Sequence, residues 1–180
     1  PIDDAVHPFV PAAAMPHAHP GQLTHEESLA FLRQIPEFGD PMPTLILTGG
    51  DPLARPDFLP LIDEARSLGI DVSITPAATP ALTREVLQTL TEHGVTALGL
   101  SLDGSTAERH DAIRGIEGTY YRTLAAIRWA AELGMPLQVN TLVTAETAPD
   151  MPAVYELLRP LGLTRWSLFF LISVGRGTVL

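Results

Sequence analysis

Cysteine is absent from all 180 residues of the sequence. This absence excludes disulfide bonds, thiolate nucleophiles, zinc ribbons and an ordinary cysteine-ligated iron–sulfur cluster built from these residues. Lysine is absent as well, so all 11 basic residues are arginines, against 21 acidic residues and a net charge of -10. With no basic run along the chain, the composition argues against nucleic acid or an anionic membrane as a partner.

Long apolar runs are also missing. No stretch approaches the roughly 18 consecutive apolar residues of a membrane span, and the N-terminus lacks a signal-peptide pattern. We therefore expect a soluble, cytoplasmic protein. Its length and 46% hydrophobic content suit one domain with a substantial core. Because the chain starts at Pro1 without a methionine and stops at Leu180 after an apolar run, we expect a fragment of something longer.

The N-terminal segment, residues 1–22, is rich in proline and histidine, which predicts irregular structure. His17 and His19, with His7, raise the question of a metal site. Their spacing matches no ligand pair on a helix, so we predict no metal there. A helix should follow, because Thr24 with Glu27 forms a capping box ahead of an apolar face.

From that helix onward one pattern repeats: a short apolar run, a polar loop, an amphipathic helix and a glycine. The pattern predicts βαβ units and a parallel sheet buried on both faces, with helices on one outer side, while barrel and open sheet both remain possible. The predicted strands are 44–48, 71–75, 97–102, 137–143 and 166–172. The predicted helices are 57–68, 83–93, 119–133 and 150–161, with Gly69, Gly94, Gly134 and Gly162 as C-terminal caps.

In parallel β/α folds ligands bind where the carboxyl ends of the strands meet the following loops. The loop Gly49-Gly50-Asp51-Pro52 follows the first predicted strand. Adjacent glycines let a ligand approach the backbone closely, and Asp51 adds a carboxylate. A plain turn between a strand and a helix explains the same residues about equally well.

Two later strand ends carry further polar residues. Ser101 and Asp103 alternate along the third strand and can face one pocket, although Asp103-Gly104 is also an ordinary turn dipeptide. Asn140 interrupts an apolar strand, where a buried amide costs free energy unless a ligand or a neighbouring strand satisfies it. Gly50, Ser101, Asp103 and Asn140 are therefore predicted to line one pocket.

Taken together, these motifs resemble the radical S-adenosylmethionine (SAM) superfamily, in the branch with a C-terminal auxiliary-cluster (SPASM) domain. TGGDPL at Thr48 to Leu53 resembles its Gly-Gly-Glu/Asp-Pro element. SLDG at Ser101 to Gly104, followed by HD and RG, resembles its fourth-strand signature, and Phe169 to Gly177 resembles the strand beside adenine. The resemblance runs over about residues 23–177, with residues 23–180 as the core domain, truncated before any auxiliary domain.

The resemblance implies a parallel (β/α)6 partial TIM-like barrel, here without its first strand, and two cofactors, SAM and a [4Fe-4S] cluster. Intact relatives form a 5′-deoxyadenosyl radical, often in peptide or cofactor maturation, so a peptide or small-molecule substrate is implied. The resemblance implies that the Gly-Gly-Asp-Pro loop binds the amino group of the SAM methionine, and that Ser101 and Arg114 bind its carboxylate. It also implies that Asp103 or Asn140 binds the ribose, and that the backbone of Leu171 and Ile172 contacts adenine.

The missing cysteines depart from the family pattern. Alignment places the Cys-x3-Cys-x2-Cys positions near Asp3, His7 and Val10, which cannot hold that cluster. A catalytically silent SAM-binding or scaffold module is therefore the alternative to a radical SAM enzyme. A third interpretation, an unrelated β/α barrel acting on phosphorylated metabolites, lacks a phosphate-binding glycine loop with a lysine.

Overall fold

The computed structural model describes residues 21–171. Several sequence predictions therefore fall outside the described residues, namely those at Asp3, His7, Val10, His17, His19 and Ile172.

Within the described part, the chain folds around a five-stranded parallel sheet in sequential order, as predicted. Each strand lies beside the one that precedes it in the sequence, so every connection crosses over through a loop and helix. The strand ends differ from the prediction by one or two residues. The strands are β1 (Leu45–Leu47), β2 (Val72–Ile74), β3 (Ala97–Ser101), β4 (Leu137–Val143) and β5 (Arg165–Phe170).

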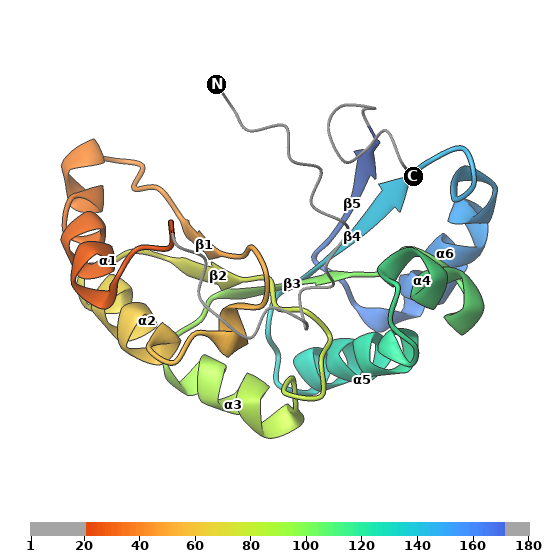
Figure 1. Ribbon diagram of the computed structural model, residues 1–180, viewed down its shortest axis with the longest axis horizontal. Helices are drawn as coiled ribbons and strands as arrows, with labels where there is room; N and C mark the ends of the chain where they lie inside the picture. The colour runs from red at the N-terminus through yellow and green to blue at the C-terminus, as the bar shows by residue number, and fades with distance from the viewer. Residues whose placement is uncertain (1–20, 172–180) are drawn as a thin grey trace.

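The sheet curves into an arc, and the helices follow its outer side (Figure 1). This is the partial barrel that the resemblance implied, whereas the sequence pattern alone left barrel and open sheet both possible. The α-helices are α1 (His25–Leu32), α2 (Phe58–Ser67), α3 (Arg84–Glu92), α4 (Ala107–Arg114), α5 (Thr119–Glu132) and α6 (Met151–Leu158), and the short 3-10 helices are η2 (Ile35–Phe38), η3 (Pro52–Ala54), η4 (Ala148–Asp150) and η5 (Arg159–Leu161). No helix in residues 21–171 has the length and apolarity needed to cross a bilayer.

The predicted helix ends are confirmed at both kinds of terminus. At α1, the Thr24 side chain accepts from the Glu27 N–H while the Glu27 carboxylate accepts from the Thr24 N–H, which is the capping box. The four predicted C-terminal glycines all have positive φ, from 66° to 82°, the region that glycine enters without a steric penalty.

Helix α4 was not predicted. Its sequence, AERHDAIR, has few apolar residues and shows no amphipathic period, so periodicity gives no signal. Local signals do explain it: the Thr106 side chain accepts from the Arg109 N–H at the start, and Gly115 ends the helix in the left-handed conformation.

The two faces of the sheet differ in composition because side chains alternate along each strand. The outer face carries the apolar side chains that pack against the helices, among them Val72, Ile74, Leu98, Leu100 and Val139. The inner face carries several small and polar residues, with apolar side chains at Ile46, Leu142 and Phe169. The small and polar residues are Ser73, Gly99, Ser101, Gln138, Asn140 and Ser167. This polar inner face is where the fold leaves room for chemistry.

Candidate functional site

Ser101, the last residue of β3, lies beside Asn140, which is in the middle of β4. The strand register pairs them directly, and Ser167 of β5 pairs with Asn140 on its other side. The Asn140 Oδ1 atom accepts from Gln138 Nε2 at 2.7 Å, which leaves the Asn140 amide nitrogen as a donor. Ser101, Asn140 and Ser167 thus form a row of neutral hydrogen-bonding groups across the inner face.

The Gly49-Gly50-Asp51-Pro52 loop follows β1 at the same edge of the sheet. Gly49 has a φ of 120°, and a Cβ atom on Gly50 would meet no atom within 4 Å. Asp51 holds the loop in shape, because its Oδ1 accepts from the Leu53 N–H at 3.1 Å and its Oδ2 from the Thr79 hydroxyl at 3.2 Å. Pro52 begins η3. The backbone at Gly50 is therefore open to a ligand.

Asp103 faces the protein interior and is only 1% exposed. Its Oδ1 accepts from the Leu142 N–H at 2.7 Å, and its Oδ2 lies 2.5 Å from Arg114 Nη2. The predicted site residues Asp103 and Arg114 are thus brought together, but they contact each other. Arg114 Nε is buried without a hydrogen-bond partner among the described residues, so residues 21–171 leave part of this guanidinium unsatisfied.

His110 of α4 holds the Ser101–Gly104 segment in place through a hydrogen bond to its backbone. Its Nδ1 accepts from the Asp103 N–H at 3.0 Å, so this nitrogen carries no proton. The imidazole is fully buried, and burial lowers its pKa to about 4, partly opposed by the carboxylate of Asp103. Gly104 is needed for close approach, since a Cβ there would lie 2.6 Å from Arg109 Cβ and 2.8 Å from His110 N.

Asp150 is a supporting residue that the sequence analysis missed. It is 6% exposed, accepts from both the N–H and the hydroxyl of Ser105 at 2.7 Å, and pairs with Arg109 Nη1 at 2.6 Å. It therefore fixes the loop between β3 and α4 to the start of α6. The only sequence signal was an acidic residue at the expected start of a helix, which is usually a cap.

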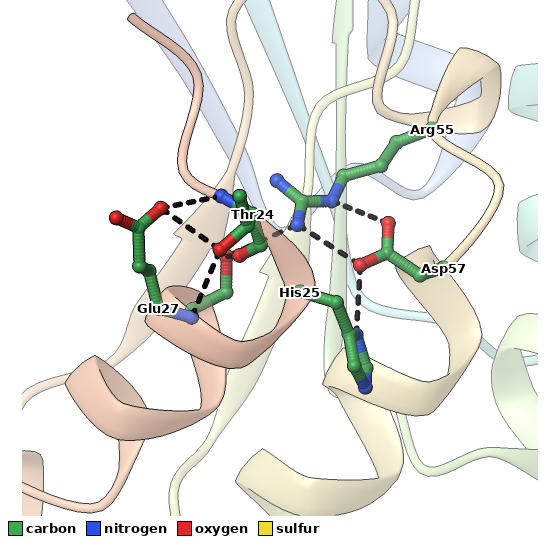
Figure 2. A network of polar contacts seen from close by, with 6 residues as sticks. Thr24, His25, Glu27, Arg55 and Asp57 are labelled. Atoms are coloured by element: carbon green, nitrogen blue, oxygen red, sulfur yellow. Dashed lines mark hydrogen bonds and ion pairs between the residues drawn. The ribbon is translucent and has the colours of Figure 1, made fainter.

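A polar network joins the N-terminal ends of α1 and α2 (Figure 2). Arg55 makes two bonds to the Asp57 carboxylate, at 2.6 and 2.9 Å, and a third to the Ser28 hydroxyl at 3.0 Å. His25 Nδ1 lies 2.8 Å from Asp57 Oδ2. The hydrogen bonds from Arg55, helped by His25, lower the pKa of Asp57 to about 2 despite partial burial. The network fixes the first crossover of the fold.

Leu171, expected near adenine, extends the pairing of β5 with β4, because its N–H donates to the Val143 carbonyl at 3.0 Å. Its neighbour Ile172 lies outside the described residues.

A [4Fe-4S] cluster does not fit the residues present, since the 180 residues contain no thiolate. Within residues 21–171, no group of three or more His, Asp or Glu side chains could hold a metal ion either. The rim, meaning the loops after β1 and β3 together with the Ser101–Asn140 pair, does fit the polar end of SAM. It combines an open glycine backbone, a carboxylate and neutral hydrogen-bonding groups, and Arg114 at the end of α4 adds a guanidinium whose Nε has no partner among the described residues.

The fold and rim define a β/α half-barrel with a polar ligand edge. The model of the radical SAM superfamily matches residues 12–158, and the chain therefore belongs to the radical SAM superfamily.

Among curated proteins, the chain is 34% identical over 169 residues to AdoMet-dependent heme synthase of Oleidesulfovibrio alaskensis, covering 94% of this chain and 43% of that protein. It is 36% identical to AdoMet-dependent heme synthase of Methanosarcina barkeri, covering 87% of this chain and 44% of that protein. It is 30% identical to PqqA peptide cyclase of Rhizobium meliloti, covering 76% and 36% respectively. The chain thus spans less than half the length of these relatives.

Among solved structures, Streptococcus suis SuiB bound to S-adenosylmethionine superposes with a TM-score of 0.76 at 17% identity, covering 90% of this chain and 37% of that chain. SuiB bound to its precursor peptide SuiA gives a TM-score of 0.73 at 16% identity, covering 88% and 35% respectively. At this identity the likeness establishes the fold.

Proposed function

We propose that this chain is the SAM-binding portion of a protein that matures a haem-type cofactor or a peptide, in the SPASM-type branch of the superfamily. The observation that carries the proposal is that, in a chain of this superfamily, the open loop at Gly50 and Ser101 follow or end strands at one edge of the sheet, with Asn140 paired to Ser101. The names of the relatives, heme synthase and peptide cyclase, support the two substrate classes. A cytoplasmic location stays a prediction.

The roles of the site residues follow from the resemblance together with the geometry. We infer that the open backbone of Gly49 and Gly50, with Asp51, receives the methionine amino group. Ser101 and Arg114 receive the carboxylate, for which a guanidinium is the natural partner.

The remaining roles concern the nucleoside half of SAM. We infer that Asn140 faces the ribose, because its amide nitrogen is a remaining donor, whereas both carboxylate oxygens of Asp103 already have partners. The backbone at Leu171 and Ile172 is proposed to flank adenine, with Ile172 outside the described residues.

The family's cluster has no ligand in this chain, so we assign these residues SAM binding and no reaction step. The same absence is the observation in favour of a second candidate, a SAM-binding or scaffold module without a cluster. The comparisons add no support to that second candidate.

Isothermal titration calorimetry of the purified chain with SAM tests the proposal. We expect binding by the parent chain, and a loss of affinity in Ser101→Ala of about tenfold, the value of one charge-assisted hydrogen bond. Ser73→Ala is the matched control, because Ser73 also lies on the inner face. It pairs with Ala97, which precedes Ser101 by roughly 13 Å of strand.

Two results would contradict the proposal: no heat of binding with the parent chain, or equal losses in the Ser73 and Ser101 variants. Circular dichroism melting of each variant separates a loss of binding from a loss of folding.

A further inference from the structure

The inner face of the sheet has an unusual charge for this protein. The chain as a whole carries a net charge of -10. The strand residues that face inward nevertheless include no aspartate or glutamate and one arginine, Arg165. An acidic protein that keeps carboxylates off one concave surface and places a cation there favours anions on that surface.

Arg165 faces inward because of its register on β5. It pairs with Gln138, and the next residue, Trp166, lies on the opposite face, where its Nε1 donates to the buried hydroxyl of Thr141 at 2.8 Å. Alternation along β5 then puts Arg165, Ser167 and Phe169 on the inner face.

The Arg165 guanidinium also has no ion-pair or hydrogen-bond partner among residues 21–171. Most arginines in residues 21–171 pair with a carboxylate, and Arg122 donates to the backbone carbonyl of Ala78. Arg128 and Arg165 are the ones in that range with no such ion pair or hydrogen bond. Arg128 is exposed on α5, outside the sheet, whereas Arg165 lies on the concave face.

An apolar wall lies above Arg165 on the same face. Leu142 and Phe169 are register partners nearer the carboxyl ends of the strands, and Phe169 is 53% exposed. Four residues of strand, roughly 13 Å, separate Arg165 from Phe169. A cation below an exposed aromatic side chain fits a molecule with an apolar body and a carboxylate at one end.

We propose that Arg165 is a specificity-determining residue that binds a carboxylate of the substrate on the inner face of the half-barrel. The inference deepens the proposed function and rests on it, because it names a substrate group recognised on the inner face, two strand residues before the row of Ser101, Asn140 and Ser167. Propionate groups of a tetrapyrrole and acidic side chains of a peptide share this chemistry.

The test uses three probes: coproporphyrin III, its fully esterified form, and a glutamate-containing peptide labelled with a fluorophore. Binding of each probe to the full chain is measured by fluorescence quenching. We expect Arg165→Gln to weaken binding of a carboxylate probe by about tenfold or more, and Arg165→Lys to restore part of it. Arg128→Gln is the matched control, since it removes the same charge from an exposed, unpaired arginine on a helix.

Each outcome decides the proposal. Arg165-dependent binding of coproporphyrin III but not of its ester supports recognition of a carboxylate on a tetrapyrrole, and Arg165-dependent binding of the peptide alone supports a peptide carboxylate. Three results would overturn it: equal affinity of the parent chain for coproporphyrin III and its ester, equal losses of probe affinity in Arg165→Gln and Arg128→Gln, or no binding of either coproporphyrin III or the peptide. A loss of SAM affinity in Arg165→Gln would also overturn it, because Arg165 would then belong to the SAM site. Failure of the parent chain to bind SAM refutes the proposed function separately.

Discussion

Acidification should destabilise this domain through His110 at a higher pH than through Asp57. Burial lowers the pKa of His110 to about 4 from 6.5. Below pH 6.5 the unfolded chain therefore takes up a proton that the folded chain does not, and the free energy of unfolding falls as the pH falls. The loss runs from pH 6.5 down to the folded pKa near 4 and then stops. Protonation also removes the acceptor that holds the Asp103 N–H.

The size of the effect follows from the shift. One pKa unit corresponds to about 1.36 kcal/mol, so His110 should cost about 2 kcal/mol between pH 6.5 and 5. This window separates His110 from Asp57, whose pKa is lowered from 3.8 to about 2. The stabilisation from Asp57 is present above pH 3.8 and is lost only as the pH falls toward 2.

Urea unfolding followed by circular dichroism at pH 7, 6, 5.5 and 5 measures this slope. In His110→Gln, which keeps an amide oxygen as an acceptor but cannot titrate, the decrease between pH 6.5 and 5 should shrink by about 2 kcal/mol. His93→Gln, at a partly exposed histidine bonded to Asp63, is the matched control for loss of a histidine. If the His110 variant keeps the parent slope, the buried neutral histidine is not the cause.

Three glycine substitutions test the loops after β1 and β3. Gly50→Ala should leave the melting temperature nearly unchanged, because the new Cβ meets no atom within 4 Å, but it should weaken SAM binding in calorimetry. Gly49→Ala should instead lower the free energy of unfolding by roughly 1–3 kcal/mol, because Gly49 has a φ of 120°. Unchanged SAM affinity in the Gly50 variant would place the ligand elsewhere. Gly104→Ala should cost about 1–3 kcal/mol in urea unfolding, because the new Cβ would lie 2.8 Å from His110 N. A variant as stable as the parent would mean that α4 shifts freely.

The parallel sheet could be predicted from the sequence because its signals are local and repeated. Each apolar strand and each glycine after a helix can be recognised from a few neighbouring residues, and the same order of strand, loop, helix and glycine recurs along the chain. Helix α4 could not be found this way, since AERHDAIR lacks an amphipathic period.

The site was only partly predictable for a different reason. Strand alternation put Ser101 and Asn140 among the residues of one predicted pocket, and the strand register pairs these two residues directly. The pairing of Asp103 with Arg114 and with the Leu142 N–H depends on how α4 folds back over the loop, which sequence spacing does not encode. Asp150 was missed because its partners, Ser105 and Arg109, come from a distant part of the chain.

Pairing across the sheet is uneven. Strands β1 and β2 share three register pairs, whereas β4 and β5 share six. Local opening of a fold starts where few contacts hold it, so the β1 side should be the less cooperative half and should exchange its amide hydrogens first. The Gly-Gly-Asp loop belongs to that half, and Asn140 belongs to the firmly paired one. A ligand that contacts both the Gly-Gly-Asp loop and Asn140 would stabilise the weaker half through its binding free energy, so that both halves of the sheet would open together.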